Sequence, residues 1–546
     1  MDALTKLADD YYAYATSDSP LGLMWDGKLD HLAEWDDFSP AAVERRKARY
    51  LTYAEAADAL DIGDDPFAIA LRDSVSTGAR SAALGLTWDA ELFQISPKMG
   101  MFEMCLSFIG TYPLKTAEHG EQYLEKLRRM PGALAVLADA ARAAAGEGRV
   151  ATARQLGATA DSIDAYLATP PGPDERLCCQ EAPTKLGPTE AEAWREARDA
   201  IVATTVREGL ASYGAALRDL ARDGRPDEKP GLCNLPGGLE VYRDAMWANL
   251  LTEHTAHEVH QVGLDKVAEI EDEYRAIAGP LFGLADVADI YARLRDDKAL
   301  VYTSPEAIVA DAEAALARAS VVAASWFGTM PASKCPAYST DYGAMAYYSP
   351  PDLETGKEGA FYFNTSNPSA WSTYELEAIT FHEAIPGHHL QFALHAENPR
   401  LHKVQKEFFN TAYAEGWGLY SERLADEMGL YSSELDRLGM LSADSLRACR
   451  LVVDTGLHAF GWGREAAIQY MLDHSPMHRS HVEQEVDRYI ALPGQALAYM
   501  IGRIEIQAIR AEAEARPGFD IREFHDALLR YGPVPLPTLR RLILGA

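Results

Sequence analysis

The segment from Phe381 to Gln391, FHEAIPGHHLQ, has the highest density of chemically active side chains in the chain, with three histidines and a glutamate in eight residues. An adjacent His and Glu, followed one or two helical turns later by another His, is how helical zinc hydrolases place two imidazoles on the metal and a carboxylate beside the attacking water. A single histidine usually satisfies a buried hydrogen bond, but this density is hard to explain in that way. The segment therefore predicts a zinc site with His382 as a ligand.

The second histidine ligand depends on the backbone at Pro386, which stands four residues after His382. Proline has no N–H and crowds the carbonyl of His382, so the helix must bulge or kink there. In an ideal helix a residue six positions on is rotated by about 240°, and one seven positions on is displaced by roughly 10 Å. The glycine directly before it favours His388, whereas the Leu-Gln pair that follows favours His389. We prefer His388 and keep His389 as an alternative.

A third protein ligand is expected from the segment YAEGWGLYSE, residues 413–422. Glu415 and Glu422 lie two helical turns apart on one face. One of them can bind the metal while the other orients a histidine ligand. Gly416 and Gly418 would let another backbone or a ligand approach closely.

A polar stripe follows on a later predicted helix, where Arg450, Asp454 and His458 are spaced at i, i+4 and i+8. His458 could contact the transition state with Asp454 orienting it, or the three side chains could form a network that braces helices. A further histidine cluster has the wrong spacing for a metal and is interpreted as structural or cleft-lining: His254, His257 and His260.

The elements that must position these residues are mainly helical. Stretches with helical spacing span residues 41–62, 118–168, 188–223, 240–278, 305–327, 373–398, 404–428, 433–474, 481–514 and 521–530. Residues 359–365, GAFYFNT, alternate aromatic and polar side chains and predict a short strand directly before the metal helix. An exposed edge of that strand could pair with an extended peptide.

Size and charge exclude several classes of protein. The 546 residues carry 51 Lys+Arg and 82 Asp+Glu, a formal charge of −31, which repels nucleic acid and anionic membrane surfaces. No run of about twenty apolar residues predicts a membrane span, and the N-terminal residues lack the apolar stretch of a signal peptide. Six cysteines without a CxxC pair suit a reducing compartment. We expect a cytoplasmic protein forming one unit over 1–546, or an N-terminal helical half over 1–190 and a catalytic half over 191–546.

Five segments together resemble the DUF885 family of bacterial zincin-like proteins: FHEAIPGHHLQ (381–391), EGWGLYSE (415–422), RLVVDTGLHAFGW (450–462), RYIALPGQALAYMIG (488–502) and FHDALLRYGPVPL (524–536). The resemblance implies a large helical fold around a deep central cleft, related to the helical oligopeptidases, with one Zn²⁺ and peptide hydrolysis as its chemistry. Many relatives are exported lipoproteins, and this chain departs from them in its N-terminal sequence.

Residue by residue, the resemblance maps the metal ligands onto His382, His388 or His389, and Glu415. It maps Glu383 onto the general base that takes a proton from zinc-bound water.

A tyrosine that donates to the developing oxyanion is also implied, because metallopeptidases of this architecture use one beside the zinc. Tyr499 is the first candidate and Tyr489 the second, with Arg488 in the same segment.

These inferences predict a zinc metallopeptidase that acts on short peptides. The alternatives are an amidase acting on a non-peptide metabolite, which would use the same machinery, and a catalytically silent binding protein. The presence of Glu383 argues against the silent protein, because a binding site needs no base.

Overall fold

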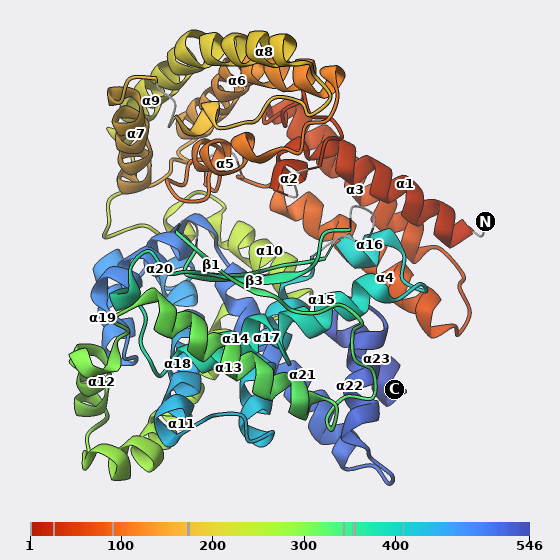
Figure 1. Ribbon diagram of the computed structural model, residues 1–546, viewed down its shortest axis with the longest axis vertical. Helices are drawn as coiled ribbons and strands as arrows, with labels where there is room; N and C mark the ends of the chain where they lie inside the picture. The colour runs from red at the N-terminus through yellow and green to blue at the C-terminus, as the bar shows by residue number, and fades with distance from the viewer. Residues whose placement is uncertain are drawn as a thin grey trace.

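The computed structural model describes residues 3–25, 28–89, 92–171, 175–341, 344–351, 353, 356–407 and 409–545. The chain folds mainly into α-helices, as predicted, with a small three-stranded sheet between two groups of helices (Figure 1).

The first nine helices form the upper part of the molecule in Figure 1 and its right-hand edge. Proline begins α3, α4 and α8, where its missing N–H costs no hydrogen bond, and Ser39 caps α3. Their bounds are α1 (Ala3–Asp18), α2 (Pro20–Trp25), α3 (Pro40–Asp58), α4 (Pro66–Gly85), α5 (Met101–Phe108), α6 (Ala117–Gly146), α7 (Ala153–Ala168), α8 (Pro188–Ile201) and α9 (Arg207–Ala221). Short helical turns η1 (Ile109–Thr111), η2 (Arg176–Cys178) and η3 (Val202–Val206) connect them.

The remaining elements form the lower, larger part of the molecule. They are α10 (Gly238–Leu250), α11 (Ala256–Phe282), α12 (Val287–Asp296), α13 (Pro305–Ala323), β1 (Ala337–Thr340), β2 (Ala346–Ser349), β3 (Ala360–Asn364), α14 (Leu376–Glu383), α15 (His388–Glu397), α16 (Lys403–Glu407), α17 (Thr411–Glu427), α18 (Glu434–His458), α19 (Arg464–Asp473), α20 (Arg479–Ala491), α21 (Ala498–Glu514), α22 (Ile521–Arg530) and α23 (Leu536–Leu544). Turns η4 (Leu232–Asn234), η5 (Lys298–Leu300), η6 (Pro368–Ala370) and η7 (Gln495–Leu497) precede α10, α13, α14 and α21.

Several predicted helical stretches contain two helices. Residues with positive φ divide them, at Gly148 between α6 and α7, at Leu251 between α10 and α11, and at Gly461 between α18 and α19. Helices α1, α2, α4, α5, α12 and α23 fall outside the predicted stretches. For α1 the stabilisation comes from contacts distant in sequence, because Tyr11 packs on Tyr50 and Tyr53 of α3.

The sheet has the strand order β1-β3-β2, with β3 parallel to β1 and antiparallel to β2. The predicted strand over 359–365 is β3, but the expectation that it has an exposed edge is wrong, because β3 is the central strand. Phe361 and Phe363 are buried on one face. On the other face Tyr362 contacts Tyr338 and Tyr347, with ring centroids 5.6 and 5.1 Å away.

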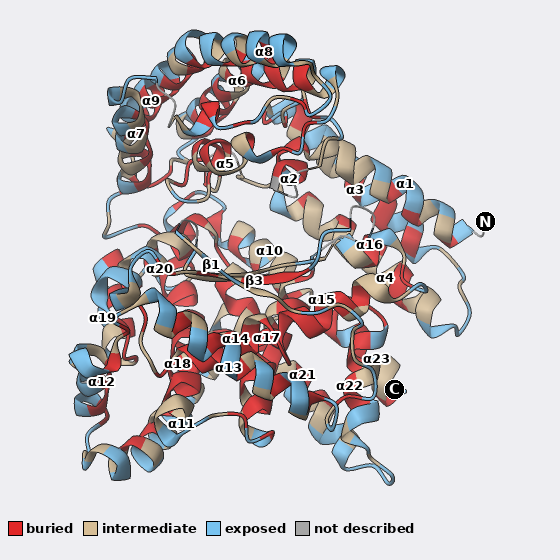
Figure 2. Ribbon diagram, in the orientation of Figure 1, coloured by how far each residue is buried: buried red, intermediate tan, exposed pale blue. Residues whose placement is uncertain are grey.

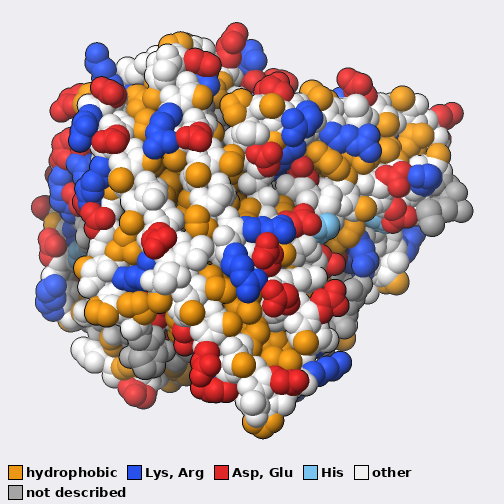
Figure 3. Space-filling model, turned by 90° about the horizontal axis from the view of Figure 1, so that it is seen from above, with side chains coloured by type: hydrophobic (Ala, Val, Ile, Leu, Met, Phe, Trp, Pro, Cys, Tyr) orange, Lys and Arg blue, Asp and Glu red, His pale blue; other side chains and the backbone are white. Residues whose placement is uncertain are grey.

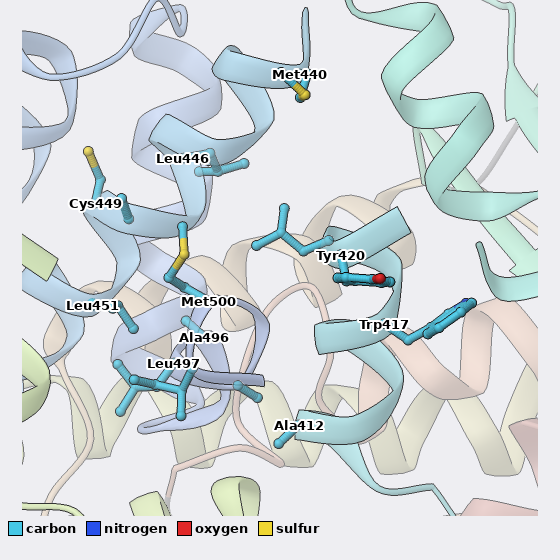
Figure 4. Close-up of a cluster of buried hydrophobic side chains, with 14 of the residues drawn as sticks. Ala412, Trp417, Tyr420, Met440, Leu446, Cys449, Leu451, Ala496, Leu497 and Met500 are labelled. Atoms are coloured by element: carbon cyan, nitrogen blue, oxygen red, sulfur yellow. The ribbon is translucent and has the colours of Figure 1, made fainter. Parts of the chain in front are cut away.

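The core of the larger part is built from helices that are buried on nearly every side. Helix α18 is almost continuously buried from Leu438 to His458 (Figure 2), as expected of a central helix. Figure 4 shows side chains of α17, α18 and α21, including Trp417, Leu446 and Met500, in this core. Helices α17 and α21 approach so closely that a Cβ atom on Gly416 would lie 2.5 Å from the carbonyl carbon of Gly502.

The upper helices have a hydrophobic cluster of their own, which extends from Leu21 to Leu220. This cluster includes residues of α8 and α9 and therefore continues past residue 190. No helix within the described ranges is both long and apolar enough to cross a membrane. On the face shown in Figure 3, acidic and basic side chains are interspersed.

Candidate metal centre

A break between two helices positions the histidines. Helix α14 ends at Glu383 and α15 begins at His388, so the predicted kink is a complete interruption of the helix. A Cβ atom on Gly387 would lie 1.9 Å from the carbonyl oxygen of His382, so only glycine fits there. The indole N–H of Trp417 donates to the carbonyls of Pro386 and Gly387, both at 3.1 Å, and ties the break to α17.

Three side chains converge at this break. One ligand atom each from His382, His388 and Glu415 lies within 4.8 Å of the other two. Nε2 of each histidine is 3.7 Å from Oε2 of Glu415, and the two imidazole rings are perpendicular, with centroids 4.8 Å apart. Ligand atoms on a tetrahedral zinc would be roughly 3.3 Å apart, given bond lengths near 2 Å. Two nitrogens and one carboxylate oxygen are also a donor set that zinc prefers, so these residues fit the metal.

Each histidine is oriented through its other ring nitrogen. Nδ1 of His382 is 2.7 Å from Oε1 of Glu422, and Nδ1 of His388 is 3.4 Å from Oε1 of Gln391. An Nδ1–H that donates to such a partner leaves Nε2 as the metal-binding atom. Gly418 makes room for the imidazole of His382, because a Cβ atom there would lie 2.6 Å from the ring.

The electrostatics of the site favour a positive charge. Burial alone would lower the pKa of His382, but Glu415 and Glu422 outweigh it and raise the pKa to about 9. Burial likewise opposes ionisation of Glu415, yet His382 and His388 hold its pKa below the usual range. Glu422 is only 1% exposed, and its Oε2 has no hydrogen-bond partner among the described residues. Buried carboxylates at this density need compensating positive charge, which protonated histidines or a metal ion can supply.

Glu383 follows His382 directly and is half-buried. Its carboxylate makes no hydrogen bond or ion pair with any residue in the described part of the chain, so both of its oxygens are available to a bound water. Burial, with a smaller contribution from Glu383, raises the pKa of the Cys335 thiol to about 12. Because Cys335 stands beside Phe361 of β3, the sheet and the candidate base are neighbours.

The alternative ligand, His389, lies outside the cluster. Its Nδ1 is 3.0 Å from the hydroxyl of Tyr348, and its Nε2 is 3.2 Å from the carbonyl oxygen of Ser333. Both ring nitrogens are therefore engaged in joining α15 to β2 and to the segment before β1. The geometry selects His388 over His389.

Tyr499 lies next to the cluster. Burial raises its pKa, and the charge of Glu415 adds to the effect. Its hydroxyl has no hydrogen-bond partner within the described ranges, and the guanidinium of Arg450 lies 4.4 Å from its ring centroid. Tyr499 therefore combines nearness to Glu415 with a hydroxyl that no described residue engages.

Tyr489 and Arg488 are bound to other residues. The hydroxyl of Tyr489 donates to Glu485 at 2.7 Å and accepts from Nε of Arg450 at 3.0 Å. Arg488 donates to Gln495 at 2.7 Å and to Glu485 at 3.1 Å. The second tyrosine candidate would have to break these bonds to act, which leaves Tyr499 as the better candidate.

The structure does not bring His458 to the metal cluster with a free ring nitrogen, because both of its ring nitrogens bond to backbone. Nδ1 accepts from the N–H of Leu232 at 3.2 Å, and Nε2 is 3.0 Å from the carbonyl oxygen of Tyr489. Asp454 does not orient it, since that carboxylate accepts from Tyr242 at 2.6 Å and from Gly494 at 3.1 Å. These side chains brace helices, as the alternative proposed, but through separate partners.

Two histidines of the cluster near residue 257 make contacts of the structural kind, whereas Nε2 of His254 is buried with no hydrogen-bond partner among the described residues. His260 lies 2.8 Å from the hydroxyl of Thr455, and His257 packs its ring against Phe460. Glu258 caps the start of α11 through Thr255.

Two residues near the site were not predicted. Gln391 orients His388, and its i, i+3 spacing within α15 was the available signal. Arg447 lies 5.8 Å from the ring centroid of Tyr499, and its i, i+3 spacing to Arg450 could have indicated it.

The chain belongs to the DUF885 family, described as "Bacterial protein of unknown function", whose model matches residues 18–543. The fold is similar to a solved structure described as "the putative lipoprotein from Colwellia psychrerythraea", with a TM-score of 0.90 and 24% identity over 99% of this chain and 98% of that one. A second similar structure, "a putative lipoprotein of unknown function from Shewanella oneidensis", has a TM-score of 0.77 and 18% identity over 100% of both chains. No curated protein matches the sequence.

Proposed function

We propose that this chain is a zinc-dependent hydrolase that cleaves peptide bonds in short peptides. The observation that carries the proposal is the convergence of His382, His388 and Glu415 with an unpartnered carboxylate, Glu383, on the residue next to a ligand. A catalytic zinc site has three protein ligands and a remaining open position, together with a base within reach of the attacking water.

The residues of the site have separate roles in this proposal. A bound zinc ion would polarise the scissile carbonyl and acidify the attacking water. Glu383 accepts the proton of that water and returns it to the leaving amine. Tyr499 donates a hydrogen bond to the carbonyl oxygen as negative charge develops there. Glu422 and Gln391 hold the imidazoles in the tautomer that binds metal.

The sheet supports a peptide as the substrate. Strand β2 is an edge strand, and its Tyr348 bonds to His389 on α15, so it lies beside the helices of the site. An extended main chain can add to such an edge, with alternate side chains in pockets. The strand that we propose to pair with the peptide is therefore β2 and not β3. A folded protein cannot present an extended strand there, so we propose that short unfolded peptides are the substrates.

The amidase alternative makes a different prediction, because it does not need main-chain pairing away from the scissile bond. A peptide series with single N-methylations along the backbone separates the two. Loss of kcat/KM at alternate non-scissile positions supports strand pairing, whereas indifference at all of them favours the small-metabolite substrate.

The chain's location in the cell is a second part of the proposal. The acidic charge and the reduced cysteines support the cytoplasm, while the two similar solved structures are each described as a lipoprotein. Fractionation of the native organism tests this, and recovery with the membrane or extracytoplasmic fraction would contradict a cytoplasmic location.

The proposed function is tested with a mixed library of short peptides, incubated with the protein with and without a chelator. Cleavage that the chelator abolishes and added zinc restores would support the proposal. Intact peptides with a fully metal-loaded protein would favour the catalytically silent alternative.

A further inference from the structure

Two arginines of α18 lie against the ring of Tyr499, and a third arginine, on α20, shares the acid Glu485 with one of them. Figure 4 shows Leu446, Cys449 and Met500 packed in the core, and the residues that follow or precede them in sequence are Arg447, Arg450 and Tyr499. The guanidinium carbons of Arg447 and Arg450 lie 5.8 and 4.4 Å from the ring centroid of Tyr499. The third arginine, Arg488, comes from α20 and stacks on Tyr489.

The three arginines carry more positive charge than their acidic partners neutralise. Glu485 is the acid that pairs with it, binding Arg450 at 2.7 Å and Arg488 at 3.1 Å. Arg447 forms no ion pair with any residue the structure describes, which is unusual for a half-buried arginine in a chain of charge −31. The group therefore carries three guanidinium groups against one carboxylate.

Two of the arginines also have donors without partners. Arg450 is only 6% exposed, and its Nη1 is buried with no hydrogen-bond partner among the described residues. The Nε of Arg447 is likewise buried without a partner among the described residues. Its Nη1 donates a long hydrogen bond of 3.3 Å to the carbonyl of Ala443. Unsatisfied buried donors cost free energy, and a bound ligand is one way in which such donors are satisfied.

The ligand class follows from the donors. Guanidinium groups bind carboxylates through paired N–H donors, with charge-assisted bonds about twice as strong as neutral ones. Tyr499 connects the arginines to the metal centre through helix packing. It stands one helical turn before Gly502, whose backbone packs against Gly416, the residue after Glu415, and its ring lies 4.4 Å from the guanidinium of Arg450. An extended peptide, at about 3.3 Å per residue, could place its end at the arginines and its scissile carbonyl at the metal centre.

We propose that Arg447 and Arg450 bind the C-terminal carboxylate of the substrate, so that the protein removes residues from the C-terminus of short peptides. This inference rests on the proposed function and narrows it to carboxypeptidase-type cleavage. In a chain with a large negative charge, a local excess of arginine also attracts an anionic peptide end that the rest of the molecule repels.

The test compares trialanine with trialanine amide, which differ in the terminal carboxylate. Wild-type protein should cleave trialanine with the higher kcat/KM. Arg447→Met should lower the acid-to-amide ratio by about 10- to 100-fold, because a hydrogen bond to a charged group contributes about 1.5–3 kcal/mol. Arg437→Met is the matched control, since Arg437 lies on the same helix but pairs with Asp426 and Glu434. It should leave the ratio unchanged.

A binding measurement gives a readout that does not depend on turnover. Calorimetry with metal-free protein should show tighter binding of trialanine than of its amide, and Arg447→Met should remove the difference. Arg447→Lys keeps the charge but not the paired donors, so it should recover part of the preference for trialanine over its amide. That recovery would also show that a variant at this position still folds.

The outcomes separate the two proposals. If wild-type protein cleaves neither these two peptides nor any peptide of the mixed library, the proposed function fails, and the calorimetric difference still decides whether the arginines bind a carboxylate. If it cleaves both peptides equally and binds them equally, the carboxylate site is overturned while the hydrolase remains. If Arg447→Met lowers both rates to the same extent, the arginine acts by supporting Tyr499, which also overturns the carboxylate site.

Discussion

At the scale of single residues, the site depends on the partners of the two ring nitrogens of each histidine. His382 faces Glu415 with Nε2 and Glu422 with Nδ1, at 3.7 and 2.7 Å. His389, one residue beyond His388, has both nitrogens engaged by Tyr348 and Ser333. Adjacent histidines therefore have different roles, which their residue type alone does not distinguish.

Alanine substitutions separate those roles. We expect His382→Ala and His388→Ala to lose bound zinc, because each removes one of three ligands, and His389→Ala to retain it. Metal content per chain, measured by atomic spectroscopy on folded variants, checks this. Stoichiometric zinc in the His388 variant together with loss in the His389 variant would reverse our assignment.

Glu383→Gln tests the base. The amide keeps the size of the side chain but cannot take the proton of water, so we expect unchanged zinc content and a rate lower by about 10²- to 10⁴-fold. Steady-state peptide hydrolysis at matched metal loading measures the effect. Turnover near that of wild type would place the base elsewhere, and loss of zinc would make Glu383 a ligand.

Much of this site could be predicted from residue type and spacing. Residue type and spacing predicted His382 as a ligand and either Glu415 or Glu422 as another, and the family resemblance then indicated Glu415 as the ligand and Glu383 as the base. The choice of His388 needed the geometry of the break, which no residue pattern gives. His458 has the polarity of a catalytic residue, but its partners, Leu232 and Tyr489, are distant in sequence, so the pattern could not show that both nitrogens are occupied.

At the scale of elements, the interruption between α14 and α15 sets the direction of His388. Its backbone turns tightly enough that the N–H of His389 donates to the carbonyl of Ala384 at 3.1 Å. The indole of Trp417 fixes the same segment to α17, the helix that supplies Glu415. The metal centre is therefore assembled by one helix break and the neighbouring helix it contacts.

Gly387→Ala tests that break. The new Cβ would collide with the backbone carbonyls of Phe381 and His382, which cannot move without shifting the ligand. We expect weaker zinc binding and a lower Tm. The control is Gly132→Ala in α6, where a Cβ meets no atom within 4 Å and alanine should stabilise the helix by about 0.5–1 kcal/mol. Titration with zinc and thermal unfolding provide both readouts, and unchanged zinc affinity in Gly387→Ala would contradict this role.

The mainly helical fold could be predicted from the periodicity of the sequence. The ends of the helices and the position of strand β3 in the sheet could not. Leu251 separates α10 from α11 with a left-handed backbone that a leucine does not signal. Strand β3 is central because β1 and β2 lie on its two sides, and the shorter alternating patterns of those strands gave no indication of the pairing.

At the scale of the whole molecule, buried ionisable groups on α18 have opposite effects on stability. Burial lowers the pKa of His458 to about 3, from an ordinary 6.5. Its contribution to stability is therefore present above pH 6.5 and is lost as the pH falls. Burial raises the pKa of Asp454 to about 7, from 3.8, so its contribution is present below pH 3.8 and is lost as the pH rises. Between pH 3.8 and pH 6.5, His458 therefore makes the free energy of unfolding rise with pH and Asp454 makes it fall.

Replacing each residue by asparagine should reveal its separate effect on the pH dependence of stability. Between pH 4 and 6.5, the stability of Asp454→Asn should rise with pH relative to wild type, and that of His458→Asn should fall, each by up to about 1.4 kcal/mol per pH unit. Chemical denaturation across that range measures both. Parallel pH profiles for wild type and the two variants would contradict the assigned protonation states.

The measurement that most directly tests the central claim combines zinc content with peptide hydrolysis on the same preparation. The purified protein is analysed for metal, dialysed against a chelator, and reloaded with zinc, with trialanine and a mixed peptide library assayed at each stage. Our account predicts close to one zinc per chain, loss of cleavage with the metal, and recovery on reloading. A folded protein that neither holds zinc nor binds it on addition, or that cleaves peptides equally well without it, would contradict the account.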